Sequence, residues 1–228
     1  MWWAAPGDVR SRHAGLLDAV ERRRRERYLR PEDRDRFTIG VALTRLVLGK
    51  ALGLSPERVP LDRSCSDCGR PHGAPRLPGG TGPYVSISHS GDRIALAVSA
   101  DGPLGVDVEV AAGHLDEVAG RLLGPAETAD LGRLETGERQ SGLVAYWTRK
   151  EAILKATGDG LRVPLTDLYV SAPGESPRLL AWRGRPELVD RFDLRTLNPG
   201  PGYAACLALI DQPYAAVHEK AATELLAE

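Results

Sequence analysis

The sequence predicts an α+β protein built from two similar-sized α/β lobes, residues 1–102 and 103–228. Each half carries helical patterns followed by segments typical of β-strands, and the turn sequence Asp101-Gly102-Pro103 lies between the halves. A chain of 228 residues can bury two small cores, and its 42% apolar and 27% charged residues are typical of soluble globular proteins.

Two helices are predicted in the first half, over residues 14–30 and from Pro31 to about Leu52, where Gly53 follows. Between residues 21 and 36 there are eight arginines and five acidic residues. Such a run is usually a solvated helix face, but arginines also bind phosphate through paired hydrogen bonds. Arg45, inside the second helix, is interpreted as part of a structural ion pair.

The Pro- and Gly-rich residues 55–83 predict an irregular loop with at most one short strand near 59–61. The alternating segments 84–88 and 94–98 then predict a β-hairpin with a tight Gly-containing turn. His89 would lie beside that turn, where its side chain can meet a ligand.

The cysteines give little support for a structural metal. Cys65, Cys68 and His72 have the spacing of half a zinc site, but a closed zinc site needs four ligands and no second Cys/His pair is nearby. Three cysteines in a chain of this length fit a reducing compartment. Neither a secretory leader nor a run of 18 apolar residues is present, so we expect a cytoplasmic protein without membrane contact.

The central strand of the second half is predicted over residues 104–110. Because side chains alternate along a strand, Asp107 and Glu109 share one face with Gly105, at roughly 6.5–7 Å from each other. Two like charges this close on a partly buried face favour a bound cation or a shared proton. Mg²⁺ prefers such oxygen ligands, although a solvated edge strand would show the same pattern.

A helix over residues 141–157 would place Trp147, Glu151 and Lys155 on one face, since they are spaced four residues apart. Gly158 and Gly160 mark its expected end. Glu151 and Lys155 could also form an ordinary surface ion pair.

The rest of the second half predicts a polar helical region over residues 115–135 that is broken at Gly124-Pro125, and several short strands. The strands are expected at 168–170, 179–182, 192–194 and 203–210. Cys206 is interpreted as a buried strand residue. The tail from about Ala215 could form an amphipathic helix.

Three segments together resemble the surfactin-synthetase-activating type of 4'-phosphopantetheinyl transferases. They are Ser-Ile-Ser-His-Ser at 86–90, Gly-Val-Asp-Val-Glu at 105–109 and Trp-Thr-Arg-Lys-Glu-Ala-Ile-Leu-Lys at 147–155. The resemblance implies a pseudo-twofold pair of α+β lobes with the active site in the cleft between them. It also implies transfer of the 4'-phosphopantetheine arm of coenzyme A to a serine of an apo acyl or peptidyl carrier protein, which leaves 3',5'-ADP.

The resemblance assigns roles to residues of this chain. It implies that Asp107, Glu109 and Glu151 bind Mg²⁺, that Glu151 also acts as the base, and that Lys155 and His89 contact phosphate. For coenzyme A it implies contacts with the following residues: Arg24, Arg63, Arg76, Ser88, His89 and Lys155. Relatives often carry Gly-Lys-Pro where this chain has Gly73-Ala74-Pro75, so that lysine contact is absent, and Arg76 is the candidate to replace it.

Carrier proteins present their serine at the start of an acidic helix, so a complementary surface should mix apolar and basic groups. Residues 111–135 are the expected contact, with Leu115, Val118, Leu122 and Leu123 either facing the carrier or facing the core. A monomer is expected.

Two other functions fit parts of the sequence. A different Mg²⁺-dependent phosphohydrolase or nucleotidyltransferase would also use three carboxylates and a lysine. A nucleic-acid-binding module could use the arginine run, but the net charge of −1 and the 5% aromatic content are atypical of one.

Overall fold

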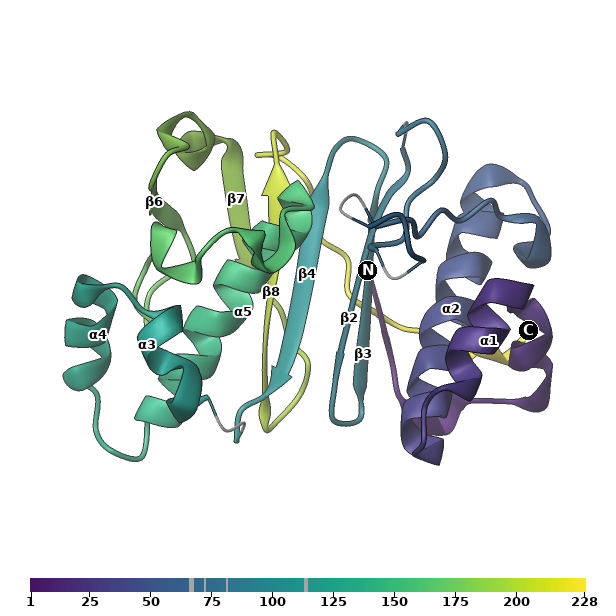
Figure 1. Cartoon of the computed structure of the whole chain (residues 1–228), viewed down its shortest axis with the longest axis horizontal. Coiled ribbons are helices and arrows are strands. Elements are labelled where there is room, and N and C mark those ends of the chain that lie inside the picture. The colour runs from purple at the N-terminus through teal and green to yellow at the C-terminus, as the bar shows by residue number, and fades with distance from the viewer. Residues whose placement is uncertain (66–67, 72, 81, 113–114) are drawn as a thin grey trace. The chain divides into compact units, whose positions relative to one another are not determined.

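The computed structural model describes residues 1–65, 68–71, 73–80, 82–112 and 115–228, and these divide into two compact units (Figure 1). Unit 1 comprises Met1–Asp101 and Val217–Glu228, and unit 2 comprises Gly102–Ala216. The tail therefore belongs with unit 1, whereas the sequence prediction placed all of 103–228 in the second lobe. The cause is local: β9 (Lys220–Ala221) pairs in parallel with β1 (Trp2–Ala4).

Unit 1 packs helices on a sheet with the strand order β2-β3-β1-β9. The predicted hairpin is present and slightly longer than expected, because β2 extends to Ser90 and β3 begins at Arg93. The core lies between this sheet and one long helix, where Ile39 and Leu43 pack with Ile94 and Leu96. The other strands and the helices of unit 1 are β2 (Tyr84–Ser90), β3 (Arg93–Ser99), α1 (Ala19–Glu26), α2 (Pro31–Leu52) and α6 (Thr223–Ala227).

The bounds of α2 agree with the prediction. Pro31 supplies a first helical residue that needs no hydrogen-bond donor, and Gly53 ends the helix in the left-handed conformation with φ 66°. The prediction for Arg45 is also confirmed: its guanidinium is 2% exposed and pairs with Glu21 at 2.8 Å and Asp18 at 3.1 Å.

One other prediction in unit 1 was wrong. The helix expected over 14–30 is interrupted, because the side chain of Asp18 accepts hydrogen bonds from the Val20 and Glu21 amides and starts α1 at Ala19. The segment before it, Ser11–Leu16, forms a 3₁₀ helix. The predicted loop over residues 55–83, with at most one short strand near 59–61, agrees with its described residues: its β-structure there is an isolated bridge between Asp62 and Arg76.

Unit 2 is a three-stranded antiparallel sheet, β4-β8-β7, crossed on one face by the long helix α5, as Figure 1 shows. A separate antiparallel pair, β5 and β6, and two short helices complete the core around Tyr146, Ile153 and Trp182. The bounds are β4 (Leu104–Val110), β5 (Leu168–Val170), β6 (Leu179–Trp182), β7 (Phe192–Thr196), β8 (Tyr203–Ile210), α3 (Ala119–Leu122), α4 (Pro125–Gly132) and α5 (Arg139–Thr157).

The predicted helices and strands of unit 2 are all present, and the break at Gly124-Pro125 separates α3 from α4. Cys206 is buried in β8, as expected. Further 3₁₀ turns connect the elements: Pro6–Asp8, Pro56–Arg58, Asp116–Val118, Gly160–Arg162, Leu165–Asp167 and Pro186–Arg191. Among the described residues, no helix combines the length and apolarity needed to cross a membrane.

Candidate functional site

Helix α5 packs closely on β4 because β4 presents a glycine to it. A Cβ atom on Gly105 would lie 2.0 Å from the carbonyl oxygen of Ala152 and 2.4 Å from the amide nitrogen of Ala156. No side chain larger than hydrogen fits there without moving the helix. The close approach brings the side chains of α5 down to the next residues on the same face of β4, Asp107 and Glu109.

Asp107 and Lys155 form the central contact of this site. Asp107 is 2% exposed, and the Nζ of Lys155 donates to its Oδ1 over 2.6 Å. The Lys155 side chain remains 29% exposed, so the ammonium reaches the carboxylate from the solvent-accessible side. The lysine therefore pairs with Asp107 on the neighbouring strand, and its charge also lowers the pKa of Glu151 on its own helix.

Glu151 occupies an environment that disfavours its charge. Its Oε1 is buried without a hydrogen-bond partner among the described residues. The pKa of this carboxyl is raised to about 7, chiefly by burial and also by the negative charges of Asp107 and Glu109, while Lys155 partly offsets them. The three carboxylates are therefore close enough to influence one another's protonation, as the predicted metal centre requires.

The carboxylates do not form a ready-made metal site. Over the described parts of the chain, no group of three or more His, Cys, Asp or Glu side chains is arranged to hold an ion. Two features account for this: Asp107 and Glu109 lie about 6.6 Å apart along the strand, and the Lys155 ammonium contacts Asp107 Oδ1. The donor chemistry nevertheless fits Mg²⁺, because carboxylate oxygens surround a region where like charges already raise a pKa. The assignment of Asp107, Glu109 and Glu151 as ligands stays a prediction.

Ser88 and His89, both predicted to contact coenzyme A, lie on β2 in unit 1. Ser88 is 7% exposed and His89 is exposed, since consecutive strand residues point to opposite faces. His89 shares its face with Ile87, whose Cδ1 lies 2.9 Å from the position of a Cβ on Gly40 of α2. The side chains of Ser88 and His89 therefore lie on opposite faces of the sheet.

The predicted arginines gather around a cavity of about 190 Å³ in unit 1, which Arg24 and Arg63 both line. Burial lowers the pKa of Arg63, which lies 3.9 Å from Glu21 Oε1, and the guanidinium of Arg24 lies 5.4 Å from the centre of the Phe37 ring. The acids of the cavity wall have other partners, because Arg45 pairs with Asp18 and Glu21, and Arg76 pairs with Asp62 at 2.6 Å. Arg63 therefore shares Glu21 with Arg45, whereas Arg24 has no ion pair among the described residues and carries the surplus positive charge of this cavity.

The predicted carrier contact is partly corrected by the packing of α3. Leu122 and Leu123 are 0% and 6% exposed and belong to the core of unit 2, so of the two alternatives the structure confirms that they face the core. Val118 instead lines a cavity of about 460 Å³ together with Trp147, Arg121 and Val163. Trp147 lies one helical turn before Glu151 on α5. The zinc interpretation of Cys65, Cys68 and His72 involves a histidine outside the described residues.

Sequence reasoning missed one buried pair that supports the site. Lys150 and Glu127 are both 0% exposed, and the Lys150 Nζ donates to Glu127 Oε2 at 2.5 Å and to the carbonyls of Leu122 and Leu165. Glu127 also accepts from the amides of Gly124 and Val170. The pair thus joins α3, α4 and the 165–170 segment to α5, next to Glu151. The sequence signal for Lys150 was its position directly before Glu151, because adjacent residues of a helix point in different directions. Nothing in the sequence pointed to Glu127 as its partner.

Comparison with known proteins gives the family of the chain. Residues 103–207 match the model of the 4'-phosphopantetheinyl transferase superfamily. A 4'-phosphopantetheinyl transferase of Bacillus subtilis is 31% identical over 159 residues, which are 70% of this chain and 68% of that protein. This chain belongs to the 4'-phosphopantetheinyl transferase superfamily.

Two further relatives show how far the similarity extends. A putative 4'-phosphopantetheinyl transferase of Synechocystis sp. is 33% identical over 70% of this chain, but the match spans 65% of that protein, just under two thirds of its length. The 4'-phosphopantetheinyl transferase Sfp of Bacillus subtilis strain 168 is 26% identical over 89% of this chain and 87% of its own length. The resemblance of the sequence motifs to the Sfp type is therefore confirmed.

Proposed function

We propose that this protein transfers the 4'-phosphopantetheine arm of coenzyme A to a serine hydroxyl of an apo acyl or peptidyl carrier protein, with release of 3',5'-ADP. The observation that carries the proposal is the arrangement of Asp107, Lys155 and Glu151 across β4 and α5 in a chain of this superfamily. We also propose that it acts as a cytoplasmic monomer.

The reaction attacks a pyrophosphate, so negative charge must be neutralised and the serine proton must be removed. In the proposal Asp107, Glu109 and Glu151 hold Mg²⁺, which when bound supplies the positive charge that neutralises the pyrophosphate oxygens. Glu151 is proposed as the base for the serine hydroxyl, because its buried Oε1 has no hydrogen-bond partner among the described residues and can accept a proton. Lys155 would contribute a fixed positive charge for the phosphoryl oxygens.

For the nucleotide end of coenzyme A, the proposal assigns the 3'-phosphate to the cavity of unit 1. Arg24 and Arg63 line it; Arg63 shares Glu21 with Arg45, and Arg24 forms no ion pair among the described residues. Guanidinium groups bind phosphate through charge-assisted hydrogen bonds, whereas water competes poorly for a buried group such as Arg63. His89, exposed on β2, and Ser88 remain proposed contacts.

For the carrier protein, the proposal uses the cavity that Trp147, Val118 and Arg121 line. It combines an apolar wall with one basic side chain, which suits the start of an acidic amphipathic helix. Because Trp147 and Glu151 share one face of α5, a helix seated against Trp147 would present its first residues toward Glu151.

The proposal is tested by incubating the protein with coenzyme A, Mg²⁺ and a panel of apo carrier proteins, followed by intact mass measurement. Wild type should add about 340 Da to at least one carrier, as calculated from the chemical formula of the arm, and Glu151→Gln should reduce the rate by at least about 100-fold. Glu187→Gln, an exposed change in the same unit and outside residues 111–135, is the matched control and should keep the wild-type rate. Release of inorganic phosphate or pyrophosphate with no mass gain on any carrier would favour the hydrolase or nucleotidyltransferase instead.

A further inference from the structure

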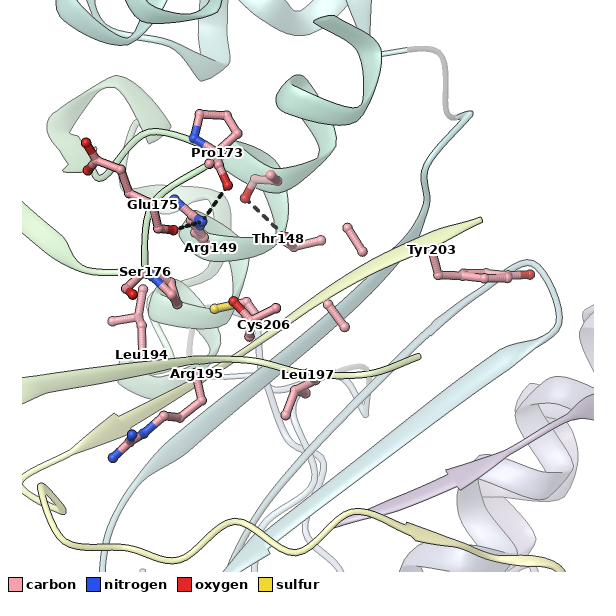
Figure 2. A pocket seen from close by; sticks show the side chains of 16 residues that line it. Thr148, Arg149, Pro173, Glu175, Ser176, Leu194, Arg195, Leu197, Tyr203 and Cys206 are labelled. Carbon is pink, nitrogen blue, oxygen red and sulfur yellow. Dashed lines mark hydrogen bonds between the residues drawn. The ribbon is translucent and has the colours of Figure 1, made fainter. Parts of the chain in front are cut away.

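Unit 2 contains a second, larger cavity of about 650 Å³ over strands β7 and β8, beside α5 (Figure 2). It exists because the residues beneath it are small: Ala145 on α5 and Ala204 and Cys206 on β8 leave space that larger side chains would fill. Leu194 and the proline-flanked segment 173–177 form the remaining walls. A cavity of this volume is in the range that holds metabolite-sized ligands.

The polar end of this cavity is the guanidinium of Arg149, which is 5% exposed. Nη1 donates to the Ser171 and Ala172 carbonyls at 2.6 and 2.8 Å, and Nη2 to the Pro173 and Glu175 carbonyls at 3.2 and 2.8 Å. A fifth bond runs from Nη1 to the Ser171 hydroxyl. All five bonds leave from the two terminal nitrogens, so the Nε–H is the donor that remains for a ligand.

The hydrogen bonds of the Arg149 guanidinium all go to carbonyl and hydroxyl oxygens, and Glu175 adds a weaker electrostatic contribution. In the part of the chain that the structure describes, no carboxylate lies within ion-pair distance of this guanidinium. Figure 2 shows the Glu175 carboxylate directed away from Arg149, whose contact is with the Glu175 carbonyl. The Arg195 side chain also points away from the cavity and pairs with Asp193. The cavity therefore has at its end one buried guanidinium that forms no ion pair with a carboxylate of the described residues, and a buried charge favours an opposite partner.

The cavity is separate from the carboxylate site but shares its supports. Cys206 at its floor pairs directly with Asp107 across β4 and β8, and Ala204 pairs with Glu109. Arg149 lies two residues before Glu151 on α5 and projects to the other side of that helix. The carboxylates line the β4 side of α5, whereas the cavity opens over β8 and β7.

We propose that this cavity is a binding site for a small organic carboxylate, with one carboxylate oxygen on Arg149 Nε and an apolar body against Ala145, Leu194 and Ala204. The single available N–H favours a carboxylate over a phosphate, because a phosphate dianion needs several donors to replace its water. The apolar walls favour a ligand with a hydrocarbon body over a small hydrophilic acid.

The test uses 4-phenylbutyrate as the probe and 4-phenylbutan-1-ol as its neutral counterpart, titrated into ¹⁵N-labelled protein up to about 10 mM. The acid should bind with a Kd on the order of 1 mM, as expected for a ligand of this size, and should shift the amides of 173–177 and 194–197. The alcohol should bind at least about tenfold more weakly, because it leaves the Arg149 charge uncompensated.

Two variants locate the site. Ala145→Phe fills the cavity and should abolish these shifts. Ser141→Phe, at an exposed position one turn earlier on α5, should bind 4-phenylbutyrate with the affinity of wild type. Ala204→Leu reduces the cavity volume from the β8 side and should also abolish the shifts, so it replaces Ala145→Phe if that variant does not fold. No shift at 10 mM probe, equal affinity of acid and alcohol, or unchanged binding in the folded cavity variants would each overturn the proposal. The readout is binding alone, so it does not depend on the proposed transfer reaction.

Discussion

The ammonium of Lys155 donates to Asp107 Oδ1 over 2.6 Å and joins the helix α5 to the strand β4. The lysine ammonium therefore occupies a carboxylate that is proposed as a Mg²⁺ ligand. Asp107 is the most buried of the three proposed ligands. A divalent ion with more charge and oxygen-directed coordination should compete with the lysine for this carboxylate. The first prediction follows from that competition.

Mg²⁺ should raise the melting temperature of wild type by a few degrees when its concentration is about ten times its Kd, since binding to the folded state alone stabilises it by about 1.4 kcal/mol. Asp107→Asn should remove this rise, because an amide keeps the shape but loses the charge that attracts the ion. Differential scanning fluorimetry at constant ionic strength measures both. Asp193→Asn, on β7 in the same unit, is the control and should keep the Mg²⁺ effect. An equal rise in Asp107→Asn would remove Asp107 from the metal assignment.

Gly105 allows the close packing of α5 on β4, and Gly105→Ala should be strongly destabilising. The new Cβ would lie 2.0 Å from the Ala152 carbonyl oxygen, a backbone atom that moves only if the helix moves. We expect a loss of at least about 3 kcal/mol in the free energy of unfolding, at or above the upper end for overpacked cores. Urea denaturation followed by circular dichroism measures it.

The matched control is Gly132→Ala in α4, where a Cβ would meet nothing within 4 Å. That change should leave stability unchanged or raise it by up to about 1 kcal/mol, because alanine is the better helix former. Equal effects of the two substitutions would show that the tight contact at Gly105 does not determine the position of α5.

Much of the framework around this contact follows from the sequence. The bounds of α2 were predictable because Pro31 and Gly53 determine its ends by their own backbone preferences, and β4 because Asp107 and Glu109 alternate with valines. The spacing of Glu151 and Lys155 gave their shared helix face. Local patterns of this kind need no knowledge of the rest of the fold.

The remainder depended on tertiary packing. The pairing of Lys155 with Asp107 requires the depth at which α5 lies on the sheet, and Gly105 sets that depth through contacts with residues about 50 positions away. The buried pair of Lys150 and Glu127 and the carbonyl contacts of Arg149 join segments that no periodicity relates. The start of α1 was misplaced because Asp18, read as a helix residue, acts as its cap.

The buried pair should show strong coupling. Lys150→Met leaves the Glu127 carboxylate without its cation at 0% exposure, so we expect a loss of about 3–5 kcal/mol in the free energy of unfolding. Adding Glu127→Gln should recover part of that loss, because the amide is neutral and its single oxygen can still accept from one of the two amides, Gly124 or Val170, which bond to different oxygens of Glu127. Chemical denaturation of the two single variants and the double variant gives the coupling energy. Additive losses in the double variant would mean that the two charges do not stabilise each other.

Glu151 should make the stability of the metal-free protein depend on pH. Its pKa is raised from an ordinary value of 4.5 to about 7, so the folded state holds a proton that the unfolded state has released between these values. Stability therefore falls as pH rises from about 4.5 to 7, by on the order of 3 kcal/mol, and stays low above that range. Glu151→Gln, which stays neutral, should be more stable than wild type at pH 8 and similar to it at pH 4.5. Urea denaturation in EDTA at both pH values measures the difference, with Glu135→Gln as the exposed control. A Glu151→Gln variant that is no more stable than wild type at pH 8 would show that the buried carboxylate is compensated by a partner in the folded protein.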